Sequence, residues 1–141
     1  LEENGSTSRK SFVVAKGVNK KNFVVTCDIY LERDAVFNLV FRSDSVYGSY
    51  YMARIDTRAG GTNGILVAMN KYSWGYVSQT NSIVANDFWH HLELIVSNYN
   101  IKMMIGGVLI LDIQDKQITR SGTIGMFNEV KRVFVNNFEI K

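Results

Sequence analysis

Tyr50, Arg54 and Asp56 lie within one short segment, four and two residues apart. Side chains an even number of residues apart on a β-strand point to the same face, so these three would share one surface. An aromatic ring offers a flat apolar patch, and an ionised Arg or Asp side chain makes strong hydrogen bonds to hydroxyl groups. The spacing therefore favours a site for a polyhydroxylated ligand. The alternative is an exposed ion pair between neighbouring strands, which contributes less than about 1 kcal/mol to stability.

Arg42 is a further candidate for this site, because it stands in an otherwise apolar segment at residues 35–43. A cation in such a strand is unfavourable unless it is paired, and a bound ligand would provide the partner. Alternation along the strand predicts that Arg42 shares the outer face with Asn38 and Val40.

Trp74 and Tyr76 would provide a surface on which a sugar ring stacks. They alternate with small residues in the segment 72–79, where aromatic rings are poorly covered. The alternative is a small apolar cluster beneath a loop. Glu129, in the loop before the last strand, is a candidate hydrogen-bond acceptor, and its alternative is a solvated loop charge. Trp89 stands at the start of a strand and is predicted to lie in the core.

Other chemistries find little support in the sequence. Glycoside hydrolysis needs two carboxylates at a defined separation, whereas the Asp and Glu residues are dispersed at strand ends. His90 and His91 would point to opposite faces of a strand and could not bind one metal ion together. Cys27 falls in an apolar alternation and is predicted to be a small core residue rather than a nucleophile. Sandwich folds commonly hold a structural calcium ion, but no calcium-binding loop is legible, and we expect no cofactor.

The apolar residues recur mainly with period two, which predicts strands rather than helices. Proline is absent, and the pair Gly106-Gly107 is typical of a two-residue hairpin turn. About ten to twelve short strands at hairpin spacing favour an all-β fold, a two-sheet antiparallel β-sandwich or jelly roll. We expect a single domain over residues 1–141, flexible at residues 1–10 and in a loop at residues 59–64. The predicted strands cover residues 22–31, 35–43, 49–57, 65–70, 72–79, 88–97, 101–105, 108–113, 123–128 and 133–140.

The composition narrows the classes of partner. With 141 residues and 46% hydrophobic side chains, the chain can bury a core, and its single cysteine allows no intrachain disulfide. The net charge of +3 is scattered without a basic stripe, so we expect no nucleic-acid partner. No apolar run reaches about 18 residues, so we expect no membrane-spanning segment.

Several segments resemble those of a known module family. Leu-Val-Phe-Arg-Ser at residues 39–43 and Tyr-Tyr-Met-Ala-Arg-Ile-Asp at residues 50–56 are similar to its central strands. Within residues 22–141, the chain resembles carbohydrate-binding module family 66, and much of the pattern is shared with laminin-G-like modules and 3-keto-disaccharide hydrolase domains. Two departures are the Gly-Gly hairpin, where Asp-Gly is usual, and the charged residues 128–132, where an aromatic side chain is expected. The other similar segments lie at residues 89–96, 100–103, 109–112, 121–126 and 133–138.

The resemblance implies a concanavalin-like sandwich that binds carbohydrate without catalysing a reaction. It implies a polysaccharide or oligosaccharide partner, with fructans such as levan and inulin favoured. It also implies a monomeric module in a larger, secreted or cell-surface glycoside hydrolase. Two alternatives stay open: a laminin-G-like adhesion module that binds a protein or another glycan, and a diverged glycosidase-type domain. The residues expected to hold a terminal sugar are Arg42, Tyr50, Arg54, Asp56, Trp74, Tyr76 and Glu129.

Overall fold

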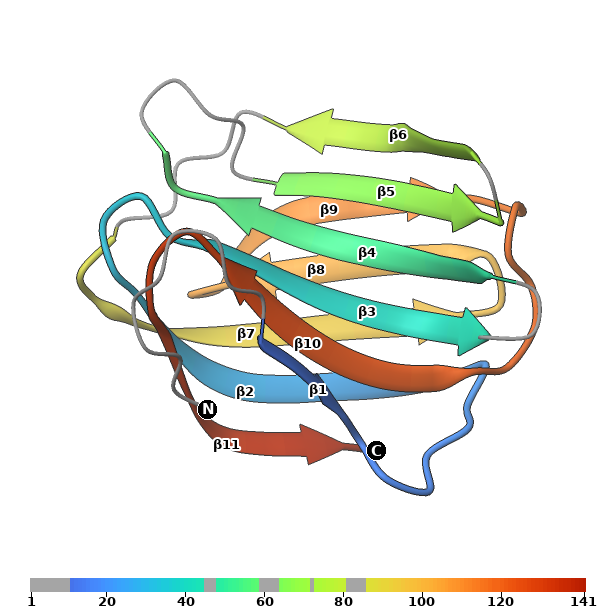
Figure 1. Cartoon of the computed structure of the whole chain (residues 1–141), viewed down its shortest axis with the longest axis horizontal. Helices are drawn as coiled ribbons and strands as arrows, with labels where there is room; N and C mark the ends of the chain where they lie inside the picture. The colour runs from blue at the N-terminus through green and yellow to red at the C-terminus, as the bar shows by residue number, and fades with distance from the viewer. Residues whose placement is uncertain (1–10, 45–47, 59–63, 72, 81–85) are drawn as a thin grey trace.

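The chain folds into two antiparallel β-sheets that lie face to face (Figure 1). The computed structural model describes residues 11–44, 48–58, 64–71, 73–80 and 86–141. The predicted all-β sandwich is confirmed. The start of the chain at residues 1–10, residues 59–63 of the predicted loop and the first residue of the predicted strand 72–79 lie outside the described ranges. No helix forms in the described ranges, so they hold no helix long and apolar enough to span a membrane.

Each sheet is built from neighbouring antiparallel strands. The six-stranded sheet contains, in spatial order, β1 (Ser11–Val14), β10 (Thr123–Glu129), β3 (Val36–Asp44), β4 (Ser49–Asp56), β5 (Gly64–Asn70) and β6 (Ser73–Thr80). The five-stranded sheet contains β11 (Val133–Ile140), β2 (Phe23–Leu31), β7 (Trp89–Ser97), β8 (Asn100–Ile105) and β9 (Val108–Gln114).

The predicted strands agree with the observed ones to within a residue at each end, apart from β1. This strand has four residues and pairs with β10 at the edge of the six-stranded sheet. Its segment is too short to display a period of two, so the sequence pattern did not reveal it.

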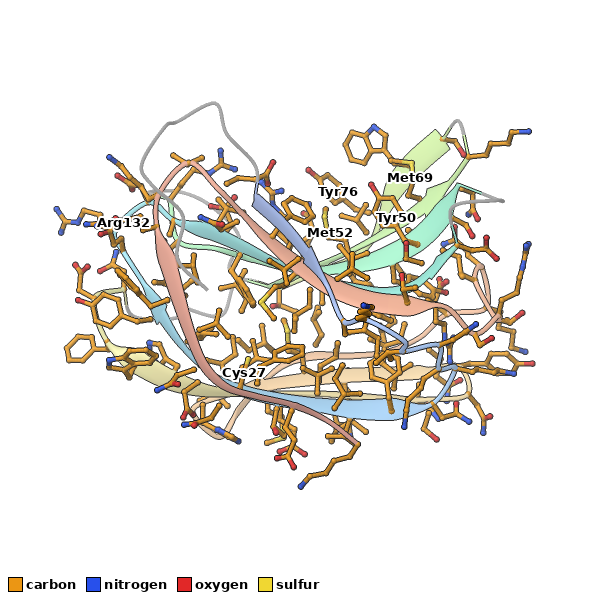
Figure 2. The ribbon with its side chains drawn as sticks, turned by 60° about the horizontal axis from the view of Figure 1, so that its bottom comes forward. Cys27, Tyr50, Met52, Met69, Tyr76 and Arg132 are labelled. Atoms are coloured by element: carbon orange, nitrogen blue, oxygen red, sulfur yellow. The ribbon has the colours of Figure 1, made fainter. Side chains whose placement is uncertain are left out.

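The core lies between the sheets and is filled by alternate side chains. On β2, Val25, Cys27 and Ile29 are buried, while the residues between them are only partly buried. Figure 2 shows Cys27 on the side of its sheet that faces the other sheet. Burial, and to a smaller extent the charge of Asp28, raises the pKa of the Cys27 thiol to about 12. Cys27 is therefore a core residue, as predicted, and remains an unreactive thiol at neutral pH.

The outer face of the six-stranded sheet is also partly covered. Phe37, Leu39 and Phe41 of β3 belong to the core, so alternation places Asn38 and Val40 on the outer face. Asn38 is nonetheless 0% exposed and Val40 only 2%. Long side chains of the flanking strands β4 and β10 must therefore lean over β3, and this creates the walls of a hollow.

Candidate ligand-binding site

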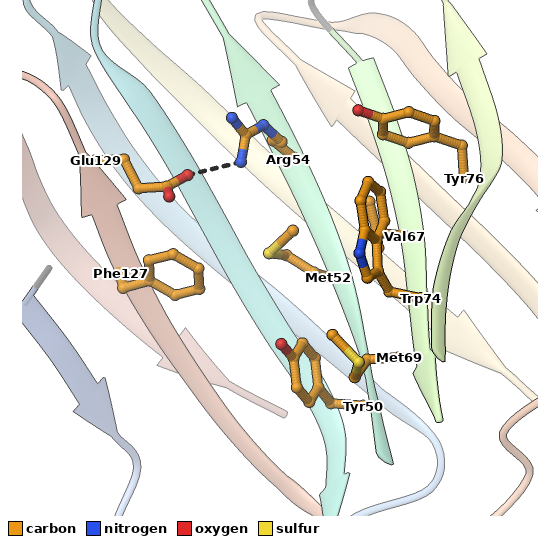
Figure 3. Close-up of a pocket in the computed structure, with 9 residues that line it drawn as sticks. All are labelled: Tyr50, Met52, Arg54, Val67, Met69, Trp74, Tyr76, Phe127 and Glu129. Carbon is orange, nitrogen blue, oxygen red and sulfur yellow. Dashed lines mark hydrogen bonds and ion pairs between the residues drawn. The ribbon is translucent and has the colours of Figure 1, made fainter. Parts of the chain in front are cut away.

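A hollow of about 380 Å³ opens on the outer face of the six-stranded sheet. β4 contributes three residues at spacing two, Tyr50, Met52 and Arg54, because the residues between them point into the core. Figure 2 shows Tyr50, Met52, Met69 and Tyr76 together on the side of the sheet away from Cys27. The complete lining is Tyr50, Met52, Arg54, Val67, Met69, Trp74, Tyr76, Phe127 and Glu129 (Figure 3).

Trp74 and Tyr76 form an aromatic wall at one side of the hollow (Figure 3). Their exposed fractions are 61% and 57%, which is high for rings of this size. The ring centroids lie 5.5 Å apart with an angle of 84° between the planes, so one ring stands edge-on to the other. Both residues lie on β6, the last strand in the order of the sheet. The wall therefore presents apolar surface that a ligand could cover.

An ion pair closes the opposite side of the hollow. Arg54 Nη1 donates to Glu129 Oε2 at 2.6 Å, and Figure 3 shows this pair reaching across β3. The two side chains are 18% and 19% exposed, so both remain accessible from the hollow. Glu129 is the last residue of β10 rather than a loop residue, and its outward direction brings it to Arg54. The pair joins residues 75 positions apart, a proximity that the spacing of the sequence does not reveal.

The floor of the hollow is apolar and its two sides differ in chemistry. Met52, Val67 and Met69 lie between the aromatic wall and the ion pair. The arrangement suits a ligand with one apolar face and a rim of neutral polar groups, because aromatic rings cover the face while Arg and Glu address the rim. Within the described ranges, no three His, Cys, Asp or Glu side chains gather as they would around a metal ion.

Asp56 does not reach the surface of the hollow, which corrects its expected role as a ligand contact. Asp56 is only 3% exposed, and its carboxylate is hydrogen-bonded to Arg58. Arg58 Nε lies 2.9 Å from Oδ1, Nη2 lies 2.5 Å from Oδ2, and the backbone N–H of Arg58 donates to Oδ1 at 3.0 Å. Arg54 Nη2 lies 3.8 Å from Oδ2. The Asp56 carboxylate is thus already paired with Arg58, and it also lies near the Arg54 guanidinium.

Neutralising Asp56 is expected to weaken the fold in a pH-dependent way. Burial acts to raise the pKa of Asp56, but the hydrogen bonds from Arg58 and the charges of Arg58 and Arg54 outweigh it and hold the pKa below its usual value. A lowered carboxyl pKa stabilises the folded state above the unfolded pKa of about 3.9, and that stabilisation is lost as the pH falls through the folded pKa. Asp56→Asn should therefore lower the free energy of unfolding by about 2 kcal/mol at pH 7.

Urea unfolding of the native chain and Asp56→Asn between about pH 7 and pH 2 measures this effect. The difference between the two should shrink at the acid end. A difference that stays constant with pH would mean that the charge of Asp56 does not contribute to stability.

Arg42 lies outside the hollow, and its expected role as a ligand contact is also corrected. The side chain is 0% exposed. Nε donates to the carbonyl oxygen of Lys21 at 3.0 Å, Nη1 to that of Ile118 at 2.9 Å, and Nη2 to that of Asn98. These carbonyls belong to three separate connections at one end of the sandwich. The buried charge of Arg42 is paired, as the sequence predicted, but its partners are backbone carbonyl oxygens rather than a ligand.

A local irregularity in β3 turns Arg42 away from the outer face. Its φ is +48°, and the pairing of β3 with β4 shifts between Phe41 and Asp44. A bulge of this kind inserts a residue and redirects the side chain, so strict alternation fails at this point. A Cβ on Gly122 would approach the backbone of Arg42 and Ser43 to within 2.5 Å, so the neighbouring segment fits only because residue 122 is glycine.

The sequence model of one protein family, described as a 3-keto-alpha-glucoside-1,2-lyase-like domain, matches residues 1–141. The chain belongs to this family. The match agrees with the resemblance to 3-keto-disaccharide hydrolase domains noted in the strand pattern. A comparison with curated protein sequences found no match.

Solved structures share the fold of this lyase-like domain at low sequence identity. A carbohydrate-binding module of family 66 from Bacillus subtilis has a TM-score of 0.79 and 17% identity, with 94% of this chain and 81% of that chain covered. A galectin from Caenorhabditis elegans has a TM-score of 0.72 and 10% identity, with coverages of 99% and 95%. A putative glycosyl hydrolase from Parabacteroides distasonis has a TM-score of 0.66 and 11% identity, with coverages of 99% and 78%. The expected similarity to family 66 is therefore shown for the fold.

The lining of the hollow also includes residues that the sequence did not single out. Met52, Val67 and Met69 read as ordinary strand residues, and Phe127 lies next to the charged segment 128–132. That segment departs from the family 66 pattern, and it supplies Glu129. Asn38 lies directly opposite Arg54 in the pairing of β3 with β4, and its Nδ2 is 3.4 Å from Glu129 Oε2. An amide side chain within an apolar strand was the sequence signal that could have indicated this contact between Asn38 and Glu129.

Trp89 differs from its prediction as a core residue. Its exposed fraction is 55%, and its ring lies at the start of β7, 5.7 Å from the Tyr30 ring of the neighbouring strand β2. The alternation of β7 places Leu92 and Leu94 in the core and leaves Trp89 in the outward set. The alternation of the strand therefore decided the direction of the Trp89 side chain, and the general tendency of Trp to be buried did not.

Proposed function

We propose that this domain binds carbohydrate in the hollow of the six-stranded sheet and catalyses no reaction there. The observation that carries the proposal is an exposed Trp–Tyr wall facing an accessible Arg–Glu pair over an apolar floor. Sugars combine an apolar ring face with hydroxyl groups, so one molecule matches both sides of the hollow. The shared fold of a carbohydrate-binding module and a galectin supports this choice of ligand class.

The binding mechanism follows from the chemistry of the lining. The indole of Trp74 would cover the C–H face of a sugar ring and exclude water from it. Arg54 would donate N–H groups to ring or hydroxyl oxygens, and Glu129 would accept O–H groups, each with the strength of an ionised partner. Because Arg54 and Glu129 already hold each other at 2.6 Å, little side-chain entropy is lost when the ligand binds.

The finer proposal is that the ligand is the terminal fructose unit of a fructan such as levan or inulin. The domain would then act as a monomeric module that holds an attached, secreted or cell-surface glycoside hydrolase on its polysaccharide. The segments that resemble carbohydrate-binding module family 66 support this choice. A module of this kind raises the local substrate concentration even when a single site binds weakly.

Affinity electrophoresis of the whole chain in gels that contain levan, inulin or a β-glucan tests the proposal. Retardation by the fructans, relieved by free fructose, is the expected result. Migration unaffected by every polysaccharide, together with binding to a protein partner, would replace the proposal with an adhesion function.

A lyase or glycosidase activity is the second candidate, and the family match favours it. Its carboxylate would be Glu129, which lines the hollow. Product release from 3-keto-disaccharides or fructans by the isolated chain, abolished by Glu129→Gln, would overturn the non-catalytic proposal. The ion pair with Arg54 argues for a binding role, because it already engages the Glu129 carboxylate at 2.6 Å.

A further inference from the structure

A second hollow of about 390 Å³ lies at the end of β10 opposite to Glu129. Its lining is mainly polar and includes Asn19, Ser43, Asp44, Ser121 and Thr123. These side chains offer hydroxyl, amide and carboxylate groups, which exchange hydrogen bonds with a neutral polyhydroxylated ligand. The Asp44 carboxylate would repel an anion, so the chemistry disfavours phosphate or sulfate groups.

Both hollows lie on the same face of the same sheet. Thr123 and Phe127 are four residues apart on β10, while Ile124 and Met126 between them belong to the core. Thr123 lines the second hollow and Phe127 lines the first. Four residues of strand span about 13 Å, so the two hollows stand next to each other along β10.

Gly125 lies on β10 between the residues that line the two hollows. Gly125 shares the outward direction of Thr123 and Phe127, and it pairs with Val14 of β1 on one side and Val40 of β3 on the other. Gly125 and Val40 are both buried, so neighbouring side chains cover this part of β10 and β3. A ligand that occupied both hollows would therefore pass over these side chains between Phe127 and Thr123.

We propose that the ligand is a neutral oligosaccharide that occupies both hollows, with its end unit against Trp74 and its following units reaching the polar hollow at the other end of β10. This inference rests on the proposed function and adds to it the length of the ligand. Aromatic stacking fixes the end unit, and the second hollow contributes hydrogen bonds to units further along the chain.

Calorimetric titration of the whole chain with fructose and with fructo-oligosaccharides of two to five units tests the inference. A parallel series of glucose and β-glucan oligomers covers the other neutral sugars. The association constant should rise by about tenfold or more from the single sugar to the longest oligomer, since a few neutral hydrogen bonds give that gain.

The double variant Asn19→Ala, Ser121→Ala should lose this gain and keep the affinity for the single sugar. Both residues are exposed and lie outside the strands, so the fold tolerates the change. The matched control is Asn100→Ala, at an exposed position on the five-stranded sheet, which should retain the full dependence on length.

The outcomes separate this inference from the proposed function. Equal affinity for single sugars and oligomers would overturn the inference while the proposed function stands. A gain with length that survives the double variant would also overturn it, because the second hollow would not be its source. No binding of any sugar in either series would overturn both.

Discussion

Replacing Arg42 with alanine is expected to lower the free energy of unfolding by about 4 kcal/mol or more. The substitution removes three charge-assisted hydrogen bonds and leaves the carbonyl oxygens of Lys21, Ile118 and Asn98 without their donor. It also opens a cavity where a fully buried side chain had been. Because domains of this size are stable by only about 5–15 kcal/mol, thermal unfolding should begin more than about 10 °C lower.

Circular dichroism melting and urea titration measure the loss in Arg42→Ala. Arg33→Ala is the matched control, because Arg33 is exposed in a turn and its loss should change stability by no more than about 0.5 kcal/mol. Arg42→Lys should fall between the two, since one ammonium group cannot reach three separated carbonyls as a planar guanidinium does. If Arg42→Ala melted like the native chain but failed to bind sugar, Arg42 would be a ligand contact after all.

Replacing Trp74 with alanine is expected to weaken carbohydrate binding by about 30-fold, which corresponds to roughly 2 kcal/mol. Trp74 supplies the largest open apolar surface of the hollow, and alanine offers almost none of it. The stability of the domain should fall by less than about 1 kcal/mol, because the indole is mainly exposed and its principal ring contact is Tyr76. Titration of the polysaccharide that retards the native chain measures the first effect, and melting measures the second.

Tyr99→Ala provides the matched control for the loss of an exposed aromatic ring. Tyr99 is 39% exposed and lies next to β8 of the other sheet, where Lys116 contacts its ring. It should bind sugar as the native chain does. Trp74→Phe should recover part of the affinity lost in Trp74→Ala, because a smaller ring keeps some stacking surface. Unchanged affinity in Trp74→Ala would move the binding site away from this hollow.

Strand parity let the sequence predict one side of the candidate site. Tyr50 and Arg54 were expected to share an outer face, and they do, because an even spacing on a regular strand fixes the direction of each side chain. The same rule placed Trp74 and Tyr76 together on an exposed strand. It failed for Arg42, where a bulge and a positive φ break the alternation.

The amino-acid sequence by itself determined the strands, the core-facing side chains and the sandwich class, because alternating hydrophobicity acts locally along each strand. Only the tertiary structure decided which charged groups pair: Glu129 with Arg54, and Asp56 with Arg58. It also decided that Arg42 donates hydrogen bonds to the backbone of three separate connections. It also decided that Gly125 lies between two hollows. These relations depend on which strands become neighbours and in what register. That choice is made by burial over the whole chain, since pairing brings together residues that local spacing leaves unrelated.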